Sequence, residues 1–196
     1  MASAHTNQQQ LAQLVQRVDD HQQLSDLISR YGIAVDDRDF DTLASLFAPD
    51  VQFQDVKGRD AVIAFYKVRT ALFSTSTHYA HTWHFDFSSE TQASGVVSAS
   101  AELCIQGQTV RLSLRYLDRY IKTTTGWVFH VRDVKFRYVL PLDQVAQGLD
   151  QPLRVRWPGT EPRQADLPDL LQTYIDSRTT PAPLQNLGHH ESDRSR

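Results

Sequence analysis

Three histidines lie three residues apart in the segment STHYAHTWHFDF, residues 76–87. Histidine serves both as a metal ligand and as a catalytic base. The aromatic residues of this segment favour a β-strand. In a regular strand we expect His78 and His81 on opposite faces, and His78 and His84 on one face but ~20 Å apart. Three such side chains cannot close around one ion, so we predict no metal site here and ask whether one histidine does chemistry.

A carboxylate earlier in the chain could complete a site with one of these histidines. Asp36 directly follows Val35, the last residue of an apolar helix face. On an ideal helix it lies ~100° around the axis from Val35, at the border of the buried face. A half-buried aspartate fixes the tautomer of a neutral histidine and stabilises the imidazolium, so that the two transfer protons as a pair. His78 and Asp36 are therefore a candidate dyad. Two alternatives stay open, in which His78 is an ordinary strand residue and Asp36 is a surface acid at a helix end.

Helices dominate the first part of the chain. Apolar residues from Leu24 to Val35 recur at three- and four-residue intervals, which predicts an amphipathic helix. Asp41 is expected to be the N-cap of a short second helix in FDTLASLF. The predicted elements are a modestly helical Gln-rich stretch at 8–22, helices at about 22–37, 40–47 and 58–73, and a strand at 51–56.

Strands dominate the next part of the chain. Four long runs rich in β-branched and aromatic residues are separated by turn residues, for example in SSETQASG and TTTG. These runs cover residues 77–87, 93–107, 109–123 and 126–140. Helices followed by an antiparallel meander predict an α+β fold, in which a curved sheet wraps over the N-terminal helices and encloses a pocket.

The bulk properties fit one folded domain with a small-molecule or protein partner. The chain has 196 residues, of which 40% are apolar, enough for one substantial core. Its net charge of -3, without charge blocks, gives no electrostatic reason to expect nucleic-acid or membrane binding. The single cysteine, Cys104, cannot form an internal disulfide. The chain shows neither a signal-peptide pattern nor ~18 consecutive apolar residues, so we expect a cytoplasmic protein.

We divide the chain into an N-terminal extension (1–20), one folded domain (21–141) and a C-terminal extension (142–196). The last part is rich in Pro, Gln and Asp and carries one helix-like segment, LPDLLQTYIDS. We expect it to be partly packed and partly disordered. His189 and His190 are expected to lie in a disordered tail and not to bind a metal.

Four segments resemble the SnoaL-like branch of the nuclear-transport-factor-2-like superfamily, whose members have a cone-shaped α+β fold. They are LISRYGIAVDDRDFDTLASLFAPDVQF, GRDAVIAFY, THYAHTWHFDF and LRYLDRYIKTTTGWVFHVRDVKF. The resemblance covers about residues 20–140. Within the superfamily the chain is most similar to the scytalone dehydratase, bile acid 7α-dehydratase and lindane dehydrochlorinase families, which use a His-Asp pair for elimination reactions.

The resemblance implies roles for individual residues. The family's helix-end aspartate falls on Asp36, its strand histidine on His78, and the pocket tyrosine of the dehydratases on Tyr31. A further polar residue of the dehydratases implies a substrate-binding position near Glu102 or Cys104. The arginine of the dehydrochlorinase implies another substrate-binding position near Lys122.

The resemblance implies a lyase that needs no cofactor. His78, held by Asp36, would remove a proton next to an activating group, and a hydroxyl would leave with help from Tyr31. Two alternatives remain: an isomerase or cyclase with the same dyad, in which Asp36 itself could be the base, and a non-catalytic ligand-binding module. We expect a small hydrophobic substrate, such as a secondary metabolite, and a homodimer or homotrimer.

Overall fold

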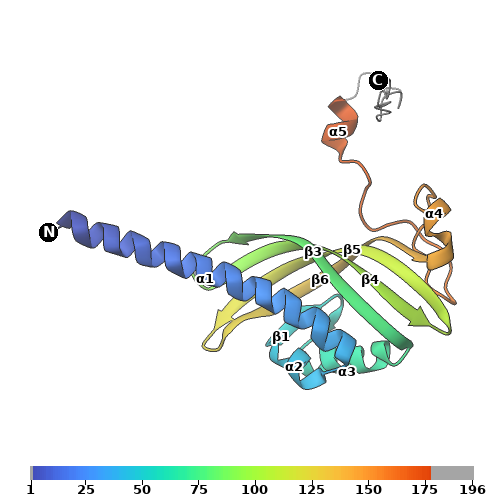
Figure 1. The fold of residues 1–196 in the computed structure, drawn as a ribbon, viewed down its shortest axis with the longest axis horizontal. Coiled ribbons are helices and arrows are strands. Elements are labelled where there is room, and N and C mark those ends of the chain that lie inside the picture. Colours follow the sequence, from blue (N-terminus) through green and yellow to red (C-terminus); the bar gives the residue numbers. More distant parts are fainter. Residues whose placement is uncertain (1, 178–196) are drawn as a thin grey trace, which may run out of the picture.

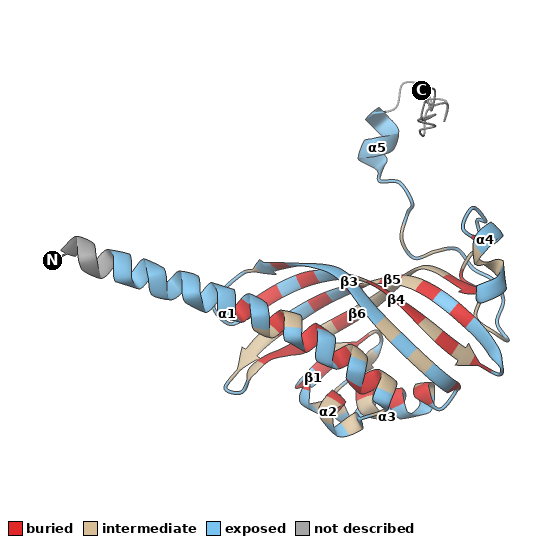
Figure 2. Ribbon diagram, viewed as in Figure 1, coloured by how far each residue is buried: buried red, intermediate tan, exposed pale blue. Residues whose placement is uncertain are grey.

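A computed structural model describes residues 2–177 of the chain, with side chains described from residue 7 onward (Figure 1). The predicted tail histidines His189 and His190 lie outside this part. Helix α1 (Ala2–Asp37) is continuous from the Gln-rich stretch into the predicted amphipathic helix, and it passes the predicted boundary after residue 20. Residues 7–19 of this helix are exposed, whereas its second half contributes buried residues to the core (Figure 2).

Two shorter helices follow α1. Helix α2 (Phe40–Ser45) is capped by Asp39, whose carboxylate accepts a hydrogen bond from the backbone N–H of Thr42 at 3.0 Å. The predicted cap, Asp41, was wrong, because the chain turns at Arg38 and Asp41 already lies within the first helical turn. Helix α3 (Arg59–Thr70) begins directly after Gly58, whose φ of 88° suits glycine.

Six strands form one curved sheet that does not close on itself (Figure 1). The strand order is β2-β1-β6-β5-β4-β3, and all neighbours are antiparallel except β1 and β6, which are parallel. This arrangement confirms the predicted α+β class. The strands are β1 (Phe47–Phe53), β2 (Val56–Lys57), β3 (Phe73–Phe87), β4 (Gln92–Ile105), β5 (Gln108–Thr123) and β6 (Gly126–Pro141).

A β-bulge in β3 changes which face its histidines occupy. His78 pairs with the buried Ala101, but the register shifts between Ala80 and Thr82, and the alternation of faces is reversed beyond this point. The His84 side chain is consequently 76% exposed, on the outer face of the sheet. Our expectation that His78 and His84 share a face was therefore wrong.

The core lies between the concave face of the sheet and the helices α1 and α3. Leu24 and Val62 are fully buried, and Tyr31, Phe47 and Tyr66 form edge-to-face and stacked ring contacts among themselves. Burying each large apolar side chain contributes about 1.5–3 kcal/mol to the free energy of unfolding. Within residues 2–177, no helix is both long enough and apolar enough to cross a bilayer.

The chain beyond the sheet partly packs back onto it. A 3-10 helix η1 (Leu142–Gln144) and the short helix α4 (Val145–Gly148) follow β6, and α5 (Gln172–Ser177) lies in the predicted helix-like segment. Between α4 and α5, Val155 forms bridges with Val139 of β6 and with Arg163.

Candidate functional site

His78 and Asp36 lie together where the end of α1 meets strand β3. His78 Nδ1 is 2.6 Å from Asp36 Oδ1, and the backbone N–H of His78 donates to Asp36 Oδ2 at 2.7 Å. Ser76 Oγ also donates to Asp36 Oδ1, at 2.8 Å. The His78 and Asp36 side chains are 15% and 19% exposed, so the pair is largely shielded from water. The structure thus brings together the two residues of the candidate dyad.

Asp36 holds the imidazole of His78 in one orientation. Burial acts to raise the pKa of Asp36, but hydrogen bonds from His78 and Ser76 hold that pKa below its ordinary value, so the carboxylate is ionised at neutral pH. An ionised carboxylate accepts the Nδ1–H and leaves Nε2 with its lone pair. Among the described residues none hydrogen-bonds to His78 Nε2, and His78 lines a cavity. Nε2 is therefore able to take a proton from a bound molecule.

The other two histidines of the segment have different surroundings. His81 Nε2 lies 2.8 Å from Ser100 Oγ, and His84 Nε2 lies 3.2 Å from Asp86 Oδ1 on the outer face of the sheet. Neither residue lines the cavity that His78 faces. Among the described side chains, no group of three His, Cys, Asp or Glu residues could hold a metal ion.

The cavity beside His78 has a volume of about 190 Å³. This is below the ~300–1,000 Å³ of pockets for drug-sized ligands, so it suits a small molecule. Helices α1 and α3 and the inner faces of the strands provide mostly aromatic and aliphatic walls. The lining residues include Tyr31, Val35, Phe53, Phe65, Tyr66, Phe73, Leu103, Leu112, Leu114, Tyr116, Val134, Phe136 and Trp157. The cavity and fold define a domain that binds small molecules.

Two tyrosine hydroxyls meet in the wall of this cavity. Tyr31 Oη lies 2.7 Å from Tyr66 Oη, and both side chains are buried. Burial raises the pKa of Tyr31 well above its ordinary value. Tyr31 is therefore protonated at neutral pH, and when Tyr66 is the donor of their shared hydrogen bond, the O–H of Tyr31 is left for an oxygen atom of a ligand.

A buried cation lies behind Tyr31. The Arg132 guanidinium stacks 3.9 Å from the centre of the Tyr31 ring and 3.8 Å from that of Tyr116, and the residue is fully buried. Arg132 Nη2 lies 3.2 Å from Asp118 Oδ2, which also accepts a hydrogen bond from Tyr120 Oη at 2.9 Å. Burial raises the pKa of Asp118 to about 6, although Arg132 acts to lower it. Arg132 does not line the cavity itself but packs against Tyr31 and Tyr116, which do.

The structure does not bring Glu102, Cys104 or Lys122 to the cavity. Alternate residues of β4 face inward, so Leu103 lines the cavity while Glu102 and Cys104 point to the other face. Glu102 is half-exposed and lies 3.5 Å from Arg111. Lys122 Nζ lies 2.5 Å from Asp20 Oδ1, in an ion pair between β5 and α1. The implied substrate-binding positions of these three residues therefore have no counterpart in the cavity.

Several residues that form or support the cavity were not selected from the sequence, among them Tyr66, Arg132, Arg69 and Trp157. Tyr66 had a visible signal, because it follows Val62 at the four-residue spacing of a helix face. Arg132 stands as a charged residue in the strand run VFHVRDV, which is a weaker signal. Arg69 had a similar signal, because it follows Tyr66 at a three-residue spacing on the same helix. Trp157 had none, because its position depends on how the C-terminal segment folds back onto the sheet.

The chain belongs to the SnoaL-like domain family, whose sequence model matches residues 16–133. This match confirms the resemblance seen in the four sequence segments. No curated protein sequence matches the chain.

Some solved structures with the same fold carry names of dehydratases or dehydrochlorinases. A hexachlorocyclohexane dehydrochlorinase, LinA type 2, has a TM-score of 0.62 at 19% identity, covering 74% of this chain and 99% of its own. LinA-type3 from Novosphingobium barchaimii LL02 has a TM-score of 0.62 at 20% identity, with coverages of 67% and 95%. A protein assigned as a scytalone dehydratase from Novosphingobium aromaticivorans DSM 12444 has a TM-score of 0.61 at 20% identity, with coverages of 65% and 91%. At these identities the likeness shows the fold alone.

Proposed function

We propose that the protein is a lyase that needs no cofactor and eliminates water from a small hydrophobic substrate. The observation that carries this proposal is the hydrogen bond between His78 Nδ1 and Asp36, which leaves the Nε2 atom of this cavity-lining histidine without a partner among the described residues and free to act as a base. The dehydratase and dehydrochlorinase names of proteins with the same fold support an elimination.

The proposed reaction moves one proton to the histidine and one to the leaving group. His78 Nε2 takes a proton from a carbon next to a carbonyl, and the electrons of that C–H bond form the new double bond. The C–O bond on the neighbouring carbon breaks, and the departing hydroxide accepts a proton from Tyr31, which Tyr66 hydrogen-bonds. Positioned acid and base groups each contribute about 10²- to 10⁴-fold to the rate.

The surroundings of Asp36 favour His78 over Asp36 as the base. Both oxygens of Asp36 already accept hydrogen bonds from His78 and Ser76. Proton abstraction by Asp36 would require these bonds to be lost. The alternative is an isomerase or cyclase that uses His78 as its base, and the mass of the product distinguishes it from a lyase.

The test is to incubate the protein with β-hydroxy ring ketones and to measure product mass. A product that has lost one water supports the lyase, whereas conversion to a product of unchanged mass would support an isomerase or cyclase. His78→Ala should abolish turnover, and His84→Ala, on the outer face of the same strand, should retain it. A fully active His78→Ala variant would contradict the proposal. The homodimer or homotrimer and the cytoplasmic location stay predictions.

A further inference from the structure

Arg69 differs in charge from the other residues that line the cavity. Among the described lining residues it is the one with a permanent charge, since the others carry apolar, amide, hydroxyl or imidazole side chains. Arg69 lies in the last turn of α3 and is partly buried. A cation in an apolar wall is costly unless an anion compensates it.

The hydrogen-bond donors of Arg69 have no acceptor among the residues that the structure describes. A guanidinium carries five N–H donors, and no carboxylate or carbonyl among the described residues accepts one of them or pairs with Arg69. The guanidinium instead stacks on the Trp157 ring, with its Cζ 5.0 Å from the ring centre. Burial lowers the pKa of Arg69 from its ordinary value, and no neighbouring acid offsets this effect. A bound anion would provide the missing partner.

A helix-end role does not account for the position of Arg69. Cations in the last turn of a helix interact favourably with its dipole. Lys67 occupies the same last turn, but it is exposed, lies over the Phe40 ring and does not line the cavity. Arg69 would not need to face the cavity to serve the helix end.

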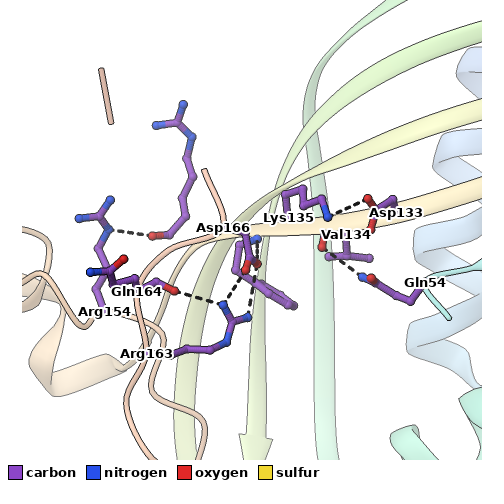
Figure 3. A network of polar contacts seen from close by, with 10 residues as sticks. Gln54, Asp133, Val134, Lys135, Arg154, Arg163, Gln164 and Asp166 are labelled. Carbon is purple, nitrogen blue, oxygen red and sulfur yellow. Dashed lines mark hydrogen bonds and ion pairs between the residues drawn. The ribbon is translucent and has the colours of Figure 1, made fainter. Parts of the chain in front are cut away.

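The C-terminal segment 153–166, which we call the strap, holds Trp157 against the cavity. It lies beyond residues 16–133 that match the family. Phe136 of β6 exchanges hydrogen bonds with Asp166, its N–H donating to Asp166 Oδ2 and its C=O accepting from the Asp166 N–H, both at 2.8 Å. Arg163 pairs with Asp166 at 2.6 Å (Figure 3). The Trp157 ring packs edge-to-face on Phe136, so the strap fixes the surface on which Arg69 stacks.

We propose that Arg69, positioned by Trp157 of the strap, binds a carboxylate group of the substrate, so that the substrate class is a small hydrophobic carboxylic acid. A guanidinium matches a carboxylate with two parallel hydrogen bonds. The aromatic and aliphatic walls would accept the hydrophobic body, and the reacting C–H would face His78, which lines the same cavity. The inference deepens the proposed function, because it names the substrate class of the same cavity.

Binding of two matched probes tests the inference without turnover. 2-Naphthoate and 2-naphthamide have nearly the same shape but differ in charge, and isothermal titration calorimetry gives the affinity of each. We expect the wild-type protein to bind the naphthoate about 10- to 100-fold more tightly, the size of a hydrogen-bonded charge interaction. Arg69→Gln should remove this preference with little change in naphthamide affinity. Lys67→Gln, on the same helical turn, should keep it.

Two further variants test whether Arg69, positioned by Trp157, causes the preference for the naphthoate. The preference should persist in His78→Ala, which shows that the imidazole is not the cation that binds the carboxylate. Trp157→Leu should weaken the preference, because it removes the ring that positions Arg69. Equal affinities of the two probes for the wild-type protein, or an unchanged preference in Arg69→Gln, would overturn the inference. Since no probe is turned over, a failure of the lyase proposal would appear in the product assay and not here.

Discussion

Asp36 and His78 are joined at two points, because the Asp36 carboxylate accepts hydrogen bonds from both the ring Nδ1–H and the backbone N–H of His78, at 2.6 Å and 2.7 Å. The first bond sets the tautomer, and the second fixes the main chain of β3 relative to the end of α1. One carboxylate therefore controls both the chemistry and the position of the imidazole.

Replacing Asp36 by asparagine should lower kcat about 10²- to 10⁴-fold, because the amide no longer stabilises the imidazolium or selects the Nδ1–H tautomer. Steady-state kinetics with a substrate found in the product assay measures the loss. Asp37→Asn is the matched control, since Asp37 is adjacent but exposed. An Asp36→Asn variant within about two-fold of the wild-type rate would show that the dyad does not act as proposed.

The dyad should also affect how stability depends on pH. The folded-state pKa of Asp36 is held below its ordinary value of 3.8, so its stabilising effect is fully present above that value and is lost as the pH falls through the lowered one. We expect the free energy of unfolding of the wild type to fall more steeply than that of Asp36→Asn below about pH 4. Urea denaturation across this range measures both curves, and parallel curves would contradict the lowered pKa of Asp36.

The buried pair Arg132 and Asp118 should be sensitive to the loss of one partner. Asp118→Asn leaves a fully buried guanidinium without its counterion, which we expect to lower the free energy of unfolding by about 3–5 kcal/mol. The double variant Asp118→Asn with Arg132→Met should be less destabilised than the sum of the single variants. Urea denaturation of all four proteins completes the cycle, and additive losses would mean that the two residues are not coupled.

Two glycines should respond oppositely to substitution by alanine. At Gly95 an added Cβ would lie 2.8 Å from Phe85 Cδ1 and 2.9 Å from the backbone oxygen of His84, so Gly95→Ala should destabilise by about 1–3 kcal/mol. At Gly32, inside α1, the nearest atom would be His78 Cβ at 3.7 Å, an ordinary contact. Gly32→Ala should therefore stabilise by about 0.5–1 kcal/mol, through the better helix propensity of alanine. Melting temperatures of both variants test the two signs.

The long elements of the fold were predictable because their periodicity is local. The four strand runs and the amphipathic helix follow from patterns of apolar residues and turn residues in the sequence. The parallel pairing of β1 with β6 did not follow, since it joins segments far apart in the chain. The bulge after Ala80 was also unpredictable, because the register of β4 opposite β3 determines it.

The residues of the candidate site were likewise predictable only in part. Tyr31, Asp36 and His78 were selected from the sequence, and the structure places Tyr31 and His78 on one cavity with Asp36 directly behind the histidine. Lys122 shows the limit of such reasoning, because its partner Asp20 lies 102 positions earlier and takes it away from the cavity. The contact of Trp157 with Arg69 likewise required the folded strap.

The central claim is that His78 Nε2 removes a proton from carbon, and exchange of that proton with solvent tests it most directly. Wild-type protein is incubated in D₂O with a ring ketone that lacks the leaving hydroxyl, and NMR follows deuterium entering the position next to the carbonyl. We predict enzyme-dependent exchange in the wild type and in His84→Ala, and none above the solvent rate in His78→Ala. Exchange at the wild-type rate in His78→Ala would contradict the account.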